Sequence, residues 1–176
     1  MRIIAGKYRH RLLDFPKNEP ELRPTKDMLK EALFSIIGAR ITDAKFLDLY
    51  AGVGSIGLEA LSRGAREAVF IDREVRYIHA NVKKLGCANA RIYRNKADRA
   101  LEILAAKKEI FDIIYLDPPY QKGLLEVSLK NIYRFGILKK DGLLIAETAK
   151  EHKLPPEFKL NDERRYGSAK ILFLES

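Results

Sequence analysis

The chain has 176 residues, with 33 Lys and Arg against 24 Asp and Glu, so its formal net charge is +9. This length favours one domain with a core that needs no disulfide, and 47% hydrophobic and 32% charged residues exclude a disordered chain. No apolar run approaches the roughly 18 residues of a membrane span, and the first residues are too polar for a signal peptide. The lone Cys87 and three scattered histidines indicate no disulfide and no metal site. We therefore expect a cytoplasmic, monomeric protein that binds neither metal nor membrane.

A basic segment opens the chain. Residues 1–13 contain no acidic residue and four cationic ones, namely Arg2, Lys7, Arg9 and Arg11. Together with a sequence pI of about 9.6, this segment favours a polyanionic partner, although a solvated basic strand would explain the same charges. Prolines at positions 16, 20 and 24 then predict a loop. The expected organisation is a basic N-terminal extension over 1–24 and a catalytic core over 25–176, within a single domain.

The core alternates between helical and extended patterns. A helix is predicted from Thr25 to about Gly38, because apolar residues fall on one face of this stretch. Further helices are expected at 55–63, 74–85, 98–107 and 124–135, between strands at 45–51, 68–72, 90–94, 111–117 and 142–148. Strands separated by helices predict a mostly parallel α/β sheet with helices on both faces. Residues 158–165 and 170–174 flank a turn at 166–168 and predict an antiparallel C-terminal hairpin.

The first predicted strand leads into three glycines spaced as G-x-G-x-x-G, at Gly52, Gly54 and Gly57. Such a turn into a helix lets a ligand approach the backbone, but dehydrogenases share it, and a tight turn without a ligand is an alternative. Asp48 helps to discriminate, because a carboxylate here repels a dinucleotide pyrophosphate and attracts a cationic ligand. S-adenosylmethionine, which carries an ammonium and a sulfonium, is therefore favoured over NAD.

Two further carboxylates lie near the ends of the next predicted strands: Asp72 ends the second strand and Asp98 follows the third. Asp72 is placed to accept the hydroxyls of a ribose, although it is also placed to cap the helix at 74–85. Asp98 is placed to accept the amino group of an adenine, and capping of the helix at 98–107 explains it nearly as well.

The sharpest signal is Asp117-Pro118-Pro119-Tyr120, directly after a buried apolar run. The prolines fix φ and remove two N–H donors, so this turn presents a carboxylate, a carbonyl and an aromatic face together. That set suits a planar ring with an exocyclic amine: Asp117 and the Pro118 carbonyl accept the amine hydrogens, and Tyr120 stacks on the ring. The alternative is a stiff turn followed by a core tyrosine.

These motifs resemble those of class I, S-adenosylmethionine-dependent amino-methyltransferases. Residues 48–57 resemble motif I of that superfamily, Asp72 its second acidic position, and residues 117–120 its (D/N)PP(Y/F) catalytic motif. Residues 1–6, 23–34 and 57–65 resemble more narrowly the bacterial 16S rRNA guanine-N2 methyltransferase family, and the resemblance spans nearly the whole chain. It implies a Rossmann-like, seven-stranded sheet whose last strand is antiparallel.

The resemblance also implies the site residues and the reaction. The cofactor S-adenosylmethionine would be held by Asp48, Tyr50, Ala51, Gly52, Gly54, Ser55, Gly57, Asp72 and Asp98. Catalysis would fall to Asp117, Pro118, Pro119 and Tyr120, and phosphates of the RNA would be held by Arg2, Lys7, Arg9, Arg11 and Arg23. The expected reaction methylates the N2 amine of a guanine in ribosomal RNA, free or within the small subunit. The alternatives are the same chemistry on adenine N6 or a protein glutamine, an NAD-dependent oxidoreductase, and a non-catalytic RNA-binding module.

Overall fold

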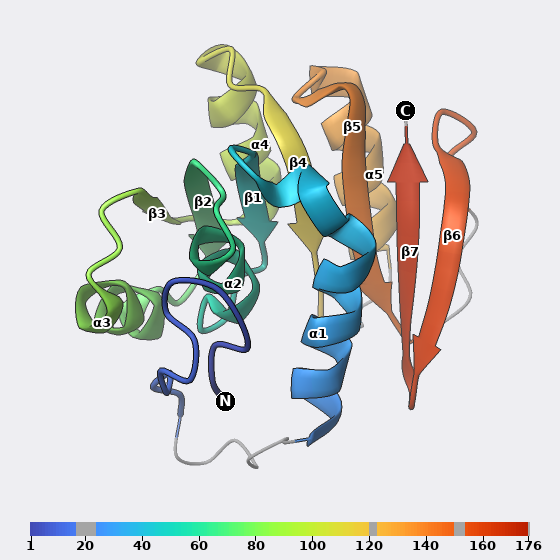
Figure 1. The fold of residues 1–176 in the computed structure, drawn as a ribbon. Helices are drawn as coiled ribbons and strands as arrows, with labels where there is room; N and C mark the ends of the chain where they lie inside the picture. The colour runs from blue at the N-terminus through green and yellow to red at the C-terminus, as the bar shows by residue number, and fades with distance from the viewer. Residues whose placement is uncertain (17–23, 120–122, 150–153, 176) are drawn as a thin grey trace.

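The computed structural model describes residues 1–16, 24–119, 123–149 and 154–175. Figure 1 shows an α/β domain built around one seven-stranded sheet. The helices are α1 (Pro24–Ile37), η1 (Gly38–Ile41), α2 (Ser55–Ser62), α3 (Arg76–Leu85), α4 (Ala97–Ala106) and α5 (Leu124–Phe135). The strands are β1 (Lys45–Leu49), β2 (Glu67–Asp72), β3 (Ala90–Arg94), β4 (Phe111–Leu116), β5 (Leu138–Thr148), β6 (Lys159–Tyr166) and β7 (Ala169–Glu175). No helix in the described part of the chain is long and apolar enough to cross a membrane.

The strand order in the sheet is β3-β2-β1-β4-β5-β7-β6. The first five strands are parallel, and β7 pairs antiparallel with both β5 and β6. The chain builds the sheet outward from β1 to β3 and then crosses to β4 on the other side of β1, so the order reverses between β1 and β4. The predicted fold class, including the antiparallel C-terminal hairpin, is confirmed.

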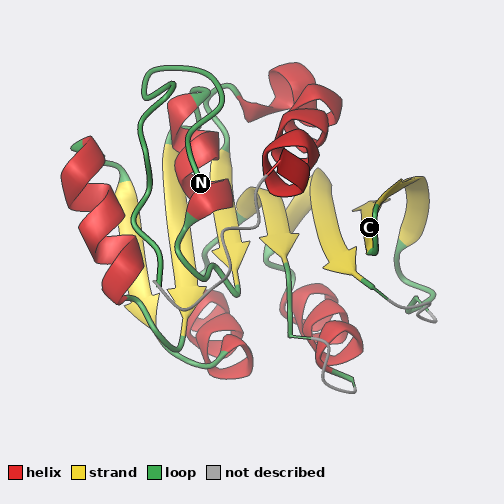
Figure 2. Cartoon of the chain, turned by 90° about the horizontal axis from the view of Figure 1, so that it is seen from below, coloured by secondary structure: helices red, strands yellow, loops and turns green. Residues whose placement is uncertain are grey.

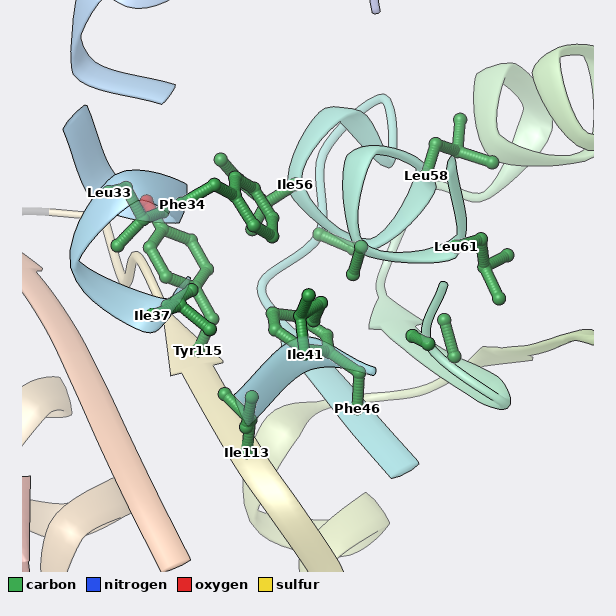
Figure 3. Packing of buried hydrophobic residues seen from close by; sticks show 14 of the residues in the cluster. Leu33, Phe34, Ile37, Ile41, Phe46, Ile56, Leu58, Leu61, Ile113 and Tyr115 are labelled. Atoms are coloured by element: carbon green, nitrogen blue, oxygen red, sulfur yellow. The ribbon is translucent and has the colours of Figure 1, made fainter. Parts of the chain in front are cut away.

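The two faces of the sheet carry separate cores, because successive strand residues point to opposite sides. In β4, Ile113 and Tyr115 pack toward α1, α2 and α3, whereas Ile114 and Leu116 pack toward α4 and α5. Figure 2 shows the helices on both sides of the sheet. In Figure 3, Leu33 and other apolar residues of α1 lie above the side chain of Tyr115. Tyr115 thus lies beneath α1, close to the carboxyl end of β4.

The N-terminal segment packs on the domain and does not project from it as an arm. An antiparallel bridge joins Arg2 to Leu12, and the side chains of Ile3 and Leu13 are buried. The fully buried carboxylate of Glu59 in α2 accepts the N–H groups of residues 4 and 5 at 2.8 and 3.0 Å. The expected extension over 1–24 is therefore a surface hairpin over residues 1–13, followed by residues 17–23, which lie outside the described part.

Several element boundaries differ from the prediction by one or two residues, and the start of β5 differs by four. Helix α3 begins at Arg76 and not at 74, because Asp72 Oδ1 accepts the Glu74 N–H at 3.0 Å and forms a turn first. Strand β5 begins at Leu138 and not at 142, because Leu138 pairs with Phe111 before a register shift. The charged residues at 139–141 conceal this pairing in the sequence.

Candidate functional site

The carboxyl ends of β1 and β4 border two adjoining cavities, of about 940 Å³ and 480 Å³. This is where the strand order reverses, and open α/β sheets bind ligands at such a point. Five residues line both cavities: Leu29, Tyr50, Asp72, Asp117 and Glu147. The larger volume lies within the range of small-molecule sites.

The three glycines after β1 have different physical roles. Gly52 and Gly54 adopt left-handed conformations with φ of 57° and 82°, which a residue with a side chain adopts at a cost. A Cβ on Gly52 would meet nothing within 4 Å, so this glycine faces open space beside the smaller cavity. A Cβ on Gly57 would lie 2.4 Å from the Phe70 ring, so the third glycine lets α2 pack closely on β2.

Tyr50 joins β1 to the glycine loop in a strained conformation. Its φ is 66°, which costs a residue with a side chain roughly 1–2 kcal/mol, and its hydroxyl lies 2.9 Å from the Ser128 hydroxyl in α5. Such strain persists where the surroundings fix it, and it clusters at ligand sites. Ala51 donates its N–H to the Ile71 carbonyl, and Ser55 begins α2 at the wall of the smaller cavity.

Asp48 is buried beneath this loop, with 1% of its surface exposed. Its Oδ2 accepts the Gly57 N–H at 2.8 Å, whereas Oδ1 is buried without a hydrogen-bond partner among the described residues. Burial raises the pKa of Asp48 to about 8; the Gly57 N–H opposes this effect, and the nearby charges of Asp117 and Asp72 add to it. The side chain lines the smaller cavity, so a cationic group bound there would favour its ionised form.

Asp72, the last residue of β2, holds the glycine loop through a hydrogen bond. Its Oδ2 accepts the Gly52 N–H at 2.8 Å, while Oδ1 makes the turn to Glu74. The capping alternative for Asp72 is wrong, since the N-cap position of α3 is Val75. Asp98 is exposed in the first turn of α4 and lines the larger cavity, but the N-cap position of that helix is a lysine.

The turn after β4 lies against the end of β1. The Asp117 N–H contacts the Leu49 carbonyl at 3.4 Å, and Asp117, Pro118 and Pro119 all line the larger cavity. Asp117 is half-buried, Pro118 is buried and Pro119 is exposed. Tyr120 lies outside the described residues. Three of the four predicted catalytic residues thus line the larger cavity, and Asp117 also lines the smaller cavity beside Gly52.

Sequence reasoning missed Glu147, which comes one residue before the end of β5. It is half-buried, lines both cavities and accepts a hydrogen bond from the Tyr115 hydroxyl at 2.6 Å. A carboxylate after the buried run 143–146, at the carboxyl end of a parallel strand, was the available signal. The β6–β7 turn, from Tyr166 to Ala169, lines the larger cavity as well.

The predicted phosphate-binding residues are dispersed over the surface hairpin. Arg2 lies 3.3 Å from a carboxylate of α1, and Arg11 donates to a main-chain carbonyl of α3 at 3.2 Å. Lys7 is exposed above the ring of a neighbouring tyrosine, and Arg9 is exposed as well. Arg23 lies outside the described residues. Lys7 and Arg9 are thus the candidates best placed to meet a partner.

Comparison with known proteins identifies the family of this chain. A family model described as Conserved hypothetical protein 95 matches residues 1–175. The chain is 39% identical over 158 residues to Ribosomal RNA small subunit methyltransferase D of Escherichia coli (strain K12), covering 88% of this chain and 78% of that protein. A solved structure of a hypothetical protein from Thermus thermophilus matches with a TM-score of 0.85 and 30% identity, covering 100% of this chain and 99% of that one.

A more distant structure has the same fold. The 16S rRNA N2 G1207 methyltransferase of T. thermophilus, solved with AdoMet and guanosine, matches with a TM-score of 0.66 over 91% of this chain and 45% of that one. At 22% identity this likeness shows the fold alone. The chain belongs to the family described as Conserved hypothetical protein 95, and the resemblance to small-subunit rRNA methyltransferases expected from its motifs is confirmed.

Proposed function

We propose that this protein transfers the methyl group of S-adenosylmethionine to the exocyclic N2 amine of a guanine in small-subunit ribosomal RNA. One observation carries the proposal: at the switch point of the sheet, Asp117 lines the smaller cavity together with Gly52 of the glycine loop, and it lines the adjoining larger cavity together with Pro118 and Pro119. The names of relatives such as the E. coli protein support the RNA substrate.

The residues around the loop fit the cofactor. Asp48 Oδ1, which has no hydrogen-bond partner among the described residues, is suited to an ammonium group. The open space at Gly52 lets a ligand lie against the backbone. The oxygens of Asp72 each accept one N–H, which leaves acceptor positions for ribose hydroxyls. Asp98 would accept the adenine amine from the far side of the larger cavity. When bound, the cofactor supplies a methyl group on a sulfonium, which is a good leaving group.

The Asp117-Pro-Pro turn would prepare the acceptor amine. The lone pair of guanine N2 is delocalised into the ring, so the amine is a weak nucleophile. Asp117 and the Pro118 carbonyl would accept its two hydrogens, orient it toward the methyl group and favour the positive charge that develops on it. The Asp117 carboxylate then takes the proton that the amine loses. Tyr120 would stack on a base that has left its helix, as enzymes acting on bases require.

Replacing Asp117 tests this assignment. We expect Asp117→Ala and Asp117→Asn to lower methyl transfer at least about 100-fold, with the Kd of the cofactor changed by less than about threefold. Transfer of labelled methyl groups to rRNA measures the first quantity, and calorimetric titration measures the second. Undiminished turnover in both variants would refute the role of Asp117.

The substrate is tested separately. Mass mapping of ribosomal RNA from cells that lack the gene should show the loss of one N2-methylguanosine, which returns with the wild-type gene. Loss of an N6-methyladenosine, or no change in any rRNA nucleoside, would contradict the proposal. Comparing free 16S rRNA with isolated small subunits then identifies which of the two is methylated.

A further inference from the structure

Glu147 lies level with the predicted catalytic carboxylate on the neighbouring strand. Leu116, the last residue of β4, pairs with Ala146 of β5, so Asp117 follows the end of β4 at the level of Glu147 in β5. Adjacent strands run about 4.8 Å apart, and residues in register point to the same side of the sheet. Both carboxylates line both cavities. Asp117 and Glu147 would therefore face a ligand bound in the larger cavity as an adjacent pair of hydrogen-bond acceptors.

A hydrogen bond from Tyr115 fixes the orientation of the Glu147 side chain. The tyrosine is 3% exposed, lies beneath α1 (Figure 3), and donates its hydroxyl to Glu147 Oε2 at 2.6 Å. Burial and the charge of Glu147 hold the pKa of Tyr115 well above its usual value, so the hydroxyl remains the donor. A carboxylate has about four acceptor positions, so the bond to Oε2 leaves Oε1 to accept from a ligand.

A third carboxylate, Asp48, lines the smaller cavity together with Asp117 and Glu147. The Oδ1 atom of nearby Asp48 is buried, and it has no hydrogen-bond partner among the described residues. The cavity therefore offers acceptors for hydrogen-bond donors and cationic groups.

The Watson–Crick edge of guanine presents such donors side by side. Its N2 amine has two hydrogens, and the adjacent N1 has one. Adenine presents its N6 amine beside an unprotonated N1, whose lone pair repels a carboxylate. We propose that Glu147 accepts the N1–H of the target guanine and thereby selects guanine over adenine. The inference rests on the proposed function and names the residue that decides its substrate.

The test uses two RNA substrates that differ at the target base, one with guanine and one with 2-aminopurine. The analogue keeps the N2 amine, but its N1 is an acceptor. We expect the wild-type protein to prefer guanine at least about 100-fold in kcat/KM, because a site built to hydrogen-bond a substrate rejects an analogue that lacks the donor.

The variant Glu147→Gln should weaken this preference in a defined way. The Tyr115 hydroxyl holds the amide oxygen, so the NH₂ group faces the base, donates to N1 of 2-aminopurine and opposes the N1–H of guanine. The preference for guanine should therefore fall at least about tenfold, while the Kd of the cofactor is unchanged. The matched control is Glu102→Gln, on the exposed face of α4, which should keep the wild-type preference.

Tyr115 is a positioning residue in this scheme. The variant Tyr115→Phe should raise KM for the guanine RNA more than it lowers kcat, since the Glu147 carboxylate loses its donor.

Two outcomes overturn the inference alone: a wild-type protein that methylates both RNAs equally well, or a Glu147→Gln protein that loses activity on both RNAs by the same factor. A wild-type protein that methylates neither RNA, nor native 16S rRNA, overturns the proposed function itself.

Discussion

Replacing Asp48 by asparagine tests the electrostatics beneath the glycine loop. The side chain is 1% exposed, one of its oxygens is buried without a partner among the described residues, and its pKa is raised to about 8 by burial. In the unfolded chain the same carboxyl titrates at its ordinary value of 3.8. The native protein therefore keeps a proton at Asp48 over a pH range in which the unfolded chain has lost it.

The sign and size of the effect follow from this difference. Because the native pKa lies above the unfolded one, the stabilising contribution of Asp48 is complete below about pH 4 and is lost as pH rises to about 8. Between these values the free energy of unfolding falls by about 1.4 kcal/mol per pH unit. From pH 5 to pH 7 the wild-type protein should thus lose roughly 3 kcal/mol relative to Asp48→Asn, which has no proton to lose.

Urea unfolding of both proteins at pH 5, 6 and 7 measures this difference. The exposed Asp43→Asn variant is the matched control and should follow the wild-type curve, since Asp43 lies on the surface at a turn. Saturating S-adenosylmethionine should reduce the difference in free energy of unfolding between Asp48→Asn and the wild-type protein at pH 7, because its ammonium favours the ionised carboxylate. Wild-type and Asp48→Asn curves that stay parallel across this range would refute the argument.

The glycines of the loop after β1 and the cationic residues of the surface hairpin give two further predictions. Gly57→Ala should lower the free energy of unfolding by about 1–3 kcal/mol, because its Cβ would lie 2.4 Å from the Phe70 ring. Gly52→Ala should lower the free energy of unfolding by only about 1 kcal/mol, because of its φ of 57°, but should weaken cofactor binding about tenfold. Equal losses of stability in urea for the two variants would contradict these separate roles of the two glycines. Replacing Lys7 and Arg9 by glutamate should weaken RNA binding and reduce the slope of log K against log salt by about 0.7–0.9 for each lost phosphate contact. Filter binding at several salt concentrations measures that slope, and an unchanged slope would show that the surface hairpin does not hold RNA.

Features that depend on neighbours along the chain were predictable from the sequence. The alternation of strands and helices was correct, and the helix at 124–135 has the predicted bounds. The glycine loop and the Asp117-Pro-Pro turn also lie where the sequence placed them, because both directly follow strands whose ends meet at one edge of the sheet. The binding and catalytic roles of these residues stay predictions.

Features that depend on tertiary pairing were missed. Glu147 lies beside the Asp117-Pro-Pro turn because of the register of β4 and β5, and it is oriented by Tyr115 on another strand. Glu59 looks like an ordinary polar residue of a short helix, yet it is fully buried and holds the N-terminal segment. A single sequence contains no information on which distant backbone groups such a carboxylate will meet.

Side chains of α2 and α3 connect the N-terminal segment, residues 1–16, to the glycine loop. The buried side chain of Asn81 in α3 accepts the N–H of Asp14, and it donates to the carbonyls of Asp14 and of Val53 in the glycine loop. Glu59, which accepts two N–H groups of the hairpin, lies in α2, the helix that directly follows the glycine loop. Buried polar groups with satisfied hydrogen bonds hold a fixed geometry. The backbone of the hairpin therefore keeps a fixed position relative to the glycine loop, so an RNA phosphate bound by Lys7 or Arg9 would lie at a defined distance from the proposed site of methyl transfer.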